Sequence, residues 1–154
     1  MAKQIMDRRA SDNKYLHRDF HCSMNFGVEY VGERFGEEGV KEYLTDFARS
    51  FYAKLIDDAK KRGLSAIREH IEKIYEIEEA SEVLNIKQTD KELRVSIEKC
   101  PAVAHIRKFG GVPCKWFVET TATVNNVIAR EAGLHFQMIS YCDEDGKAEY
   151  RFIV

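Results

Sequence analysis

The chain has 154 residues, of which 44% are apolar and 32% are charged, and its formal net charge is −2 at pH 7. A chain of this length can bury about two thirds of its unfolded surface, so it needs no disulfide or metal ion to fold as one domain. Its Lys and Arg residues are scattered among Asp and Glu, which argues against nucleic acid as a partner.

The sequence also argues against a membrane or secreted protein. No apolar run approaches the ~20 residues that a bilayer-spanning helix needs. Residues 1–13 are polar and lack the apolar centre of a signal peptide. We therefore expect a cytoplasmic protein whose four cysteines are free thiols.

Three helices are predicted in the first half of the chain. Residues 13–31 form the first, capped by Asp12 or Asn13, and residues 1–12 are expected to be a flexible tail. Residues 40–59 form a long amphipathic helix with a wide apolar stripe, which ends at Gly63. A shorter helix follows, with Ile67, Ile71, Ile74 and Tyr75 facing inward.

Alternating apolar residues then predict two hairpins, separated by two more helices. Residues 84–97 alternate around a turn at 88–91, and residues 134–154 alternate around Asp145-Gly146. Between the hairpins, helices are expected over 101–109 and 113–130, because Pro begins each and Gly follows each.

The order is three helices, a hairpin, two helices and a second hairpin. Two hairpins can join into one four-stranded antiparallel sheet, with helices covering one of its faces. The sequence therefore predicts a single α+β domain over residues 1–154, built in two layers.

Two cysteines occupy positions that favour sulfur chemistry. Cys100 precedes Pro101 at the start of a predicted helix, and Cys114 follows Pro113 in the first turn of the next. A helix N-terminus carries partial positive charge and unpaired N–H groups, which stabilise a thiolate and attract a carboxylate. Burial of either thiol as a space-filling core residue is the alternative interpretation.

Further candidates are placed around these thiols. His105 follows Cys100 by about one helical turn and is a candidate base. Cys142 alternates with Phe136 and Met138, so we expect it to point inward. Trp116 is expected to wall a pocket, and His21 is a candidate for substrate binding.

Two metal-site interpretations compete with this one. His17 and His21 have the i, i+4 spacing of metal ligands, but the zinc-protease pattern is incomplete because no Glu lies between them. A zinc site made by Cys100, His105, Cys114 and Cys142 is a second alternative. It lacks any C-x-x-C pair, so our prediction is a protein without a cofactor.

Several of these segments resemble a known family. The run Phe26 to Gly36, the helix that follows it, Cys100 to Val103 and the late Cys142 are similar to the L-2-amino-thiazoline-4-carboxylic acid hydrolase-like family. The resemblance covers residues 17–152. It implies hydrolysis of the cyclic amidine of an aminothiazoline carboxylate to a carbamoyl-cysteine. The element order also looks like that of vinyl-reductase-type and transport-particle domains, which is an analogy of fold alone.

Our leading hypothesis is therefore a hydrolase of a small cyclic amidine, with Cys100 as nucleophile and His105 as its base. Cys114, Cys142, Trp116 and His21 would bind the substrate. The alternative is a non-catalytic domain that binds or senses a small molecule between the long helix and the sheet. The wide apolar stripe of that helix also leaves a homodimer possible.

Overall fold

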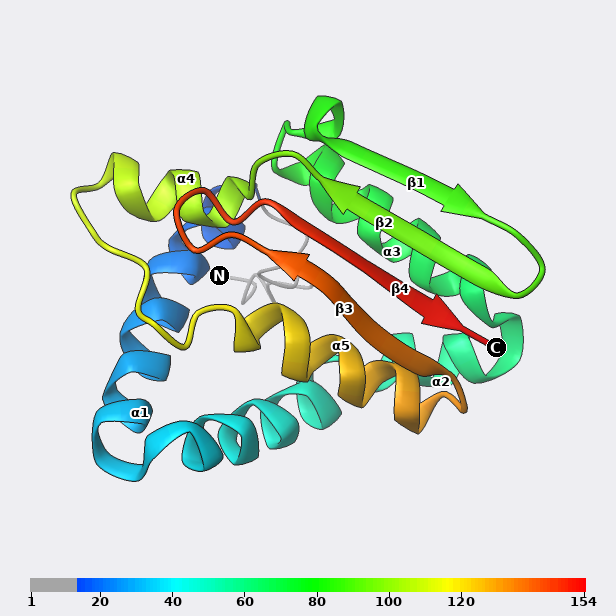
Figure 1. The fold of residues 1–154 in the computed structure, drawn as a ribbon, viewed down its shortest axis with the longest axis horizontal. Coiled ribbons are helices and arrows are strands. Elements are labelled where there is room, and N and C mark those ends of the chain that lie inside the picture. Colours follow the sequence, from blue (N-terminus) through cyan, green and yellow to red (C-terminus); the bar gives the residue numbers. More distant parts are fainter. Residues whose placement is uncertain (1–13) are drawn as a thin grey trace, which may run out of the picture.

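The computed structural model describes residues 14–154, with side chains from residue 19 onward. The expected tail, residues 1–12, and the side chain of His17 lie outside the described residues. The elements, in chain order, are α1 (Lys14–Phe51), α2 (Ala53–Arg62), α3 (Leu64–Ile77), the short 3₁₀ turn η2 (Ser81–Val83), β1 (Leu84–Gln88), β2 (Glu92–Ile97), α4 (Pro101–Lys108), α5 (Glu119–Glu131), β3 (His135–Tyr141) and β4 (Ala148–Ile153) (Figure 1).

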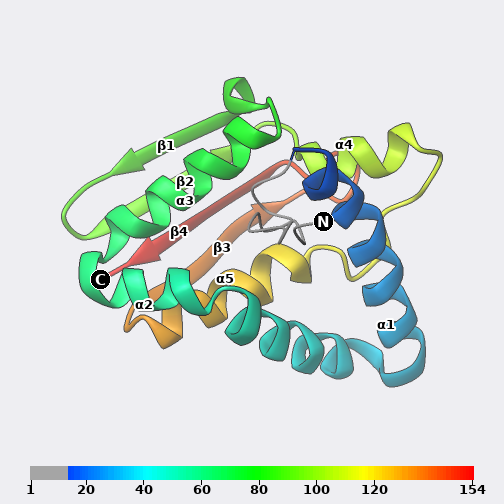
Figure 2. The ribbon, with the colours of Figure 1, turned by 180° about the vertical axis from the view of Figure 1, so that it is seen from behind.

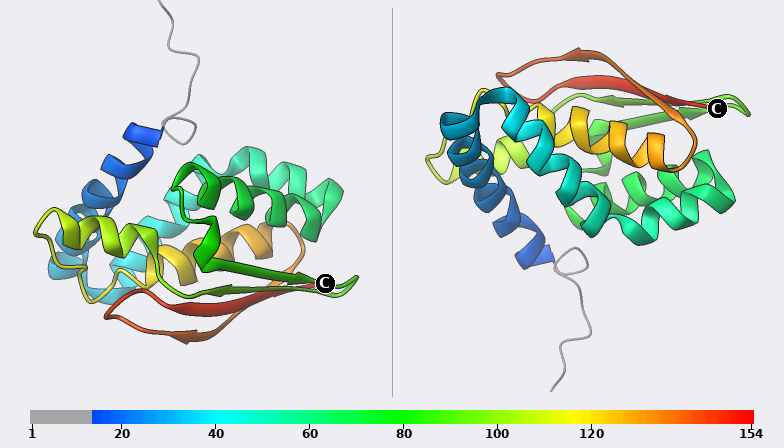
Figure 3. Two further views of the ribbon diagram at one scale, coloured as in Figure 1. Left: turned by 90° about the horizontal axis from the view of Figure 1, so that it is seen from above. Right: turned by 90° about the horizontal axis from the view of Figure 1, so that it is seen from below.

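The predicted α+β architecture is confirmed. Both hairpins form, and antiparallel pairing of β2 with β4 joins them into a four-stranded sheet of order β1-β2-β4-β3. Views along the sheet show it as one layer, with the helices gathered against one face (Figure 3). From behind, α2, α3 and α5 lie across that face (Figure 2).

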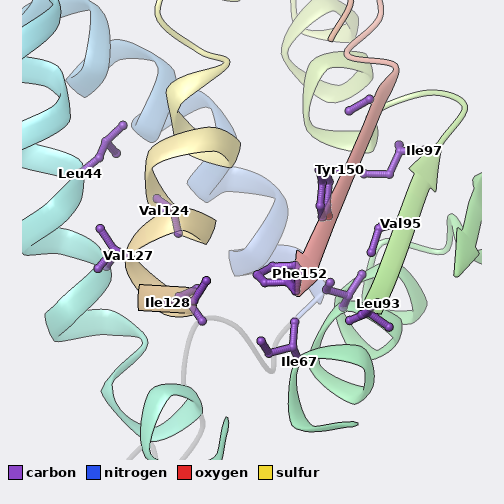
Figure 4. Packing of buried hydrophobic residues seen from close by; sticks show 14 of the residues in the cluster. Leu44, Ile67, Leu93, Val95, Ile97, Val124, Val127, Ile128, Tyr150 and Phe152 are labelled. Carbon is purple, nitrogen blue, oxygen red and sulfur yellow. The ribbon is translucent and has the colours of Figure 1, made fainter. Parts of the chain in front are cut away.

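The core lies between these two layers. Leu93, Val95 and Ile97 of β2 are buried as their alternation predicts, and Phe152 of β4 is fully enclosed. Figure 4 shows the Phe152 ring between Ile128 of α5 and Leu93 of β2. Burying a large apolar side chain stabilises a fold by about 1.5–3 kcal/mol, so this layer contact carries much of the stability.

The first two predicted helices are joined in α1. Helical structure is interrupted inside α1 only at Gly36, whose φ of 71° and ψ of −169° turn the chain between two helical halves. Gly tolerates this backbone conformation because it has no Cβ. The second half continues into α2, since Tyr52 N–H donates to Ala48 and Ile56 N–H donates to Tyr52. Within the described residues, no helix is both long enough and apolar enough to cross a membrane.

The prediction for Cys142 is wrong because β3 contains a bulge. Pairing with β4 shifts between Met138 and Ser140, so Ile139 is an extra residue on β3. One extra residue reverses the alternation beyond it. Tyr141 is half-buried as a result, and Cys142 is exposed.

The helix predicted over 113–130 begins later than expected. Residues 114–121 are joined by successive i to i+3 hydrogen bonds, for example from Phe117 N–H to Cys114 C=O, and α5 itself begins at Glu119. Cys114 therefore precedes the helix by a full turn and does not occupy its N-terminus.

Candidate functional site

A cavity of about 200 Å³ lies between the helices and the sheet. We call it the central cavity. Side chains from α1, α3 and α5 form most of its wall, and β2, β4 and the start of α4 complete it. The wall is predominantly apolar, and its larger polar side chains are His21, His70, Tyr52, Tyr75, Tyr150 and Cys100. A largely apolar pocket with a few convergent polar groups is the usual form of a small-molecule site.

Cys100 is positioned by two parts of the chain. It is the N-cap residue of α4, directly after β2, as the sequence predicts. Its backbone N–H donates to the C=O of Asp145, 3.0 Å away in the β3–β4 turn. The same turn accepts a hydrogen bond of 3.0 Å from Arg107 of α4 through the Glu144 carbonyl. The thiol is thus held where α4 meets the second hairpin.

The expected activation of Cys100 by its helix is outweighed by burial. Burial raises the pKa of the Cys100 thiol above its ordinary value, although the N–H groups of Val103 and Ala102 act in the opposite direction. The negative charge of Glu78 adds to the increase. Cys100 is therefore a neutral thiol at neutral pH, so a role as nucleophile would require a base to remove its proton.

His21 is one of two histidines, with His70, that line the cavity together with Cys100. Its Nε2 atom contacts Oε1 of Glu78, whose side chain is only 3% exposed. A buried carboxylate bonded to one ring nitrogen orients an imidazole and stabilises its protonated form. Cys100, His21 and Glu78 thus supply the three groups of a nucleophile, a base and an orienting acid.

His105 lies beside this arrangement but outside the cavity wall. It is half-buried on α4, its ring centre is 6.1 Å from that of His21, and it also contacts Phe109. His105 therefore does not line the cavity that Cys100 and His21 share. Its ring instead packs edge-on against the His21 ring.

Cys114 and Trp116 are not brought to Cys100. Neither lines the central cavity. The Cys114 N–H donates to Oδ1 of the buried Asn25 (2.8 Å), and the Asn25 amide donates to the Val112 carbonyl (2.9 Å). Because this N–H is already bonded, it cannot hold a substrate carboxylate as predicted. Trp116 packs instead on the bare backbone of Gly32 in α1.

The alternative zinc set is also dispersed. Cys100 faces the cavity, Cys114 is buried at α1, and Cys142 is exposed at the end of β3. No group of three or more His, Cys, Asp or Glu side chains that could hold a metal ion occurs in the part of the chain that the structure describes.

Four residues in or beside the cavity were not predicted as site residues. Tyr75 was expected only to face inward, and both Tyr75 and Tyr150 line the cavity. Glu78 carries no pattern that marks it as buried, because it follows the last turn of α3. His70 also lines the cavity, with its ring against Tyr52.

Comparison with known proteins adds no assignment. No protein-family model matches the sequence, and no curated protein matches it. The functional argument therefore depends on the geometry of the central cavity and on the resemblance described above.

Proposed function

We propose that the protein is a hydrolase of a small cyclic amidine, of the aminothiazoline carboxylate type, with Cys100 as its nucleophile. The observation that carries this proposal is that Cys100 and His21 line one cavity, and that His21 is bonded to the buried Glu78. Four free cysteines suit a reducing, cytoplasmic setting, in which this thiol would stay available.

The first step forms a covalent intermediate. His21 takes the proton of the Cys100 thiol, and the thiolate attacks the ring carbon that lies between nitrogen and sulfur. The bond from that carbon to the ring sulfur breaks, and the sulfur takes the proton from His21. Glu78 stabilises the imidazolium between these two transfers.

The second step uses water. His21 takes a proton from a water molecule whose oxygen attacks the carbon now attached to Cys100. The bond from carbon to the Cys100 sulfur breaks, and the proton returns to this sulfur. The net result adds one water to the substrate and releases a ring-opened carbamoyl-cysteine, with the enzyme unchanged.

Neutral donors on α5 are the candidates for binding the substrate carboxylate. Thr121 and Asn125 line the cavity, and so does Thr120, whose hydroxyl donates to the Phe117 carbonyl. No Lys or Arg lines the cavity among the described residues. Hydroxyl and amide donors near the positive N-terminal end of a helix can bind an anion without a full opposite charge.

A non-catalytic binding domain is the second candidate. The raised pKa of Cys100 favours the binding domain, because a neutral thiol in an apolar wall can contact a ligand without reacting with it. In this case the protein would release its ligand unchanged.

The test of the nucleophile uses the Cys100→Ala variant. Hydrolysis of 2-aminothiazoline-4-carboxylate can be measured by the free thiol that it releases. In this variant the rate of hydrolysis should fall to background. The exposed Cys142 offers a matched control, so Cys142→Ala should retain full activity. Turnover by Cys100→Ala at the wild-type rate would disprove the mechanism. Absence of turnover in the wild type, with ligand still bound, would favour the binding domain.

The assignment of the base has its own test. His21→Gln keeps a hydrogen-bonding partner for Glu78 but removes the base, so kcat should fall by about 10²–10⁴. His105→Gln is the control on the adjacent helix and should change kcat by much less. An equal loss in both variants would show that the two histidines act together.

A further inference from the structure

Tyr75 and Tyr150 place two buried hydroxyl groups in the wall of the central cavity. The residues are only 7% and 4% exposed. Neither hydroxyl is hydrogen-bonded to another residue in the region whose side chains are described. A buried polar group without a partner costs free energy, so native structures rarely retain one without a reason. A molecule bound in the cavity can supply this partner.

Both tyrosines line the same cavity as Cys100. Burial raises the pKa of Tyr75 and of Tyr150 far above the ordinary value, and the charge of a thiolate at Cys100 raises each further. The side chains come from α3 and β4, so they reach Cys100 from the helix layer and from the sheet. Both remain protonated at any physiological pH and act as neutral hydrogen-bond donors.

The volume of the cavity indicates the size of ligand that these hydroxyl groups can bind. An apolar cavity of about 150 Å³ holds one benzene ring. The central cavity, at about 200 Å³, accommodates one small ring with a few substituents. Pockets for drug-sized ligands measure about 300–1,000 Å³, so the central cavity is smaller than these.

We propose that Tyr75 and Tyr150 determine the specificity of the site by donating hydrogen bonds to one acceptor atom of a single-ring ligand. The ligand class is a five- or six-membered ring with a carbonyl or imine acceptor on the carbon nearest Cys100. Only the identity of that carbon rests on the proposed function, because binding by the two hydroxyls needs no reaction. A ring without the acceptor would leave both donors unpaired and would be rejected.

The experiment compares two ring probes on the full chain by NMR titration. The first probe is 2-pyrrolidinone, a ring amide, and the second is methylenecyclopentane, a hydrocarbon of similar shape. Tyr75→Phe and Tyr150→Phe should each weaken binding of 2-pyrrolidinone about tenfold, the loss expected for one hydrogen bond. Binding of methylenecyclopentane should stay within about twofold in both variants, since the ring wall is unchanged.

Tyr141→Phe is the matched control. The pKa of Tyr141 is also raised, by burial first and then by the charge of Cys100, but its side chain does not line the cavity. This variant should bind both probes like the wild type. Equal binding of 2-pyrrolidinone to all variants, or its failure to bind the wild type, would overturn the inference. Loss of both probes together in the Phe variants would show a purely structural role and would overturn it too.

The two proposals can fail separately. If Cys100→Ala loses no turnover but the tyrosine variants discriminate between the probes, the hydrolase mechanism is wrong and the inference stands. If Cys100→Ala abolishes turnover but the tyrosine variants bind both probes normally, the inference is wrong and the mechanism stands.

Discussion

Gly146 lies directly against Cys100, at the point where the β3–β4 turn meets the first turn of α4. A Cβ atom added at Gly146 would come within 2.4 Å of Cys100 Cβ and 2.9 Å of Val103 Cγ2. Its φ of +70° is in the left-handed region that favours glycine. Backbone conformation and close contact at a single residue thus fix the position of the proposed nucleophile.

Replacing Gly146 by Ala should therefore lower the stability of the fold for two reasons. The left-handed conformation costs a non-glycine residue about 1–2 kcal/mol, and the overpacking adds about 1–3 kcal/mol. Gly133→Ala is the control, because its φ is +78° with nothing within 4 Å of the added Cβ. Urea unfolding should show the larger loss for Gly146→Ala. Equal losses would mean that the turn moves freely away from Cys100.

The residues of the site differ in how far the sequence could reveal them. The position of Cys100 at the start of a helix could be predicted from its neighbours, because an alternating strand pattern precedes it and Pro101 follows it. The pairing of His21 with Glu78 joins α1 to the residue after α3, 57 positions apart, and no local pattern encodes it. The raised pKa of Cys100 likewise depends on burial by distant segments, so helix position alone predicted the wrong direction.

At the scale of elements, α1 is attached to the segment between α4 and α5 by two contacts. Asn25 bonds the backbone of Val112 and Cys114, and Trp116 lies over Gly32. A Cβ at Gly32 would come within 2.4 Å of the Trp116 ring. The absence of a side chain at Gly32 lets the two segments approach this closely.

Two glycines of the same helix give a matched test of this contact. Gly32→Ala should destabilise the fold by about 1–2 kcal/mol, because overpacking exceeds the gain in helix propensity. Gly27→Ala should stabilise it by about 0.5–1 kcal/mol, since its nearest new neighbour is Tyr43 Oη at 3.8 Å. Trp116 is the only tryptophan, so its fluorescence should change in the first variant alone. An unchanged spectrum in Gly32→Ala would contradict the contact.

The elements themselves were largely readable from the sequence. Periods of two and of three to four residues located both hairpins and all five helices, because one face of each element is buried. The β3 bulge could not be predicted in this way, because the residue types of the strand do not show where an extra residue interrupts the pairing. The start of α5 escaped it as well, because Pro113 begins a run of 3₁₀ turns rather than the α-helix.

For the whole molecule, the two faces of the sheet differ in character. Helices cover the inner face, and the outer face carries cross-strand ion pairs such as Arg94–Glu149 at 2.6 Å and Arg151–Glu92 at 2.8 Å. Surface pairs of this kind contribute little to stability, at most about 1 kcal/mol each. Stability therefore depends mainly on the inner layer, where the thiol of Cys100 and the hydroxyls of Tyr75 and Tyr150 also lie.

This arrangement predicts a fold that weakens in alkali. Burial raises the pKa values of Cys100, Cys114, Tyr75 and Tyr150 in the folded protein. The unfolded chain releases these protons first, from about pH 8.5 for Cys and about pH 10 for Tyr. The stabilisation is complete below about pH 8.5 and is lost as pH rises above it.

Urea unfolding between pH 7.5 and pH 10.5 measures this effect. The free energy of unfolding should fall with pH, by up to about 1.4 kcal/mol per pH unit for each group involved. In Cys100→Ala the free energy of unfolding should fall less steeply above pH 8.5, because Cys114 is then the remaining thiol of the two whose pKa is raised. A decline of the same slope in wild type and variant would contradict the burial of this thiol.

The position of β4 also has a consequence for the growing chain on the ribosome. β4 lies between β2 and β3 in the sheet, although it follows both in the sequence. Until β4 has emerged, β2 and β3 have no shared partner, and the turn that covers Cys100 has no strand to hold it. A chain cut before β4 therefore lacks the strand that joins the two hairpins into one sheet and that holds the turn packed against Cys100.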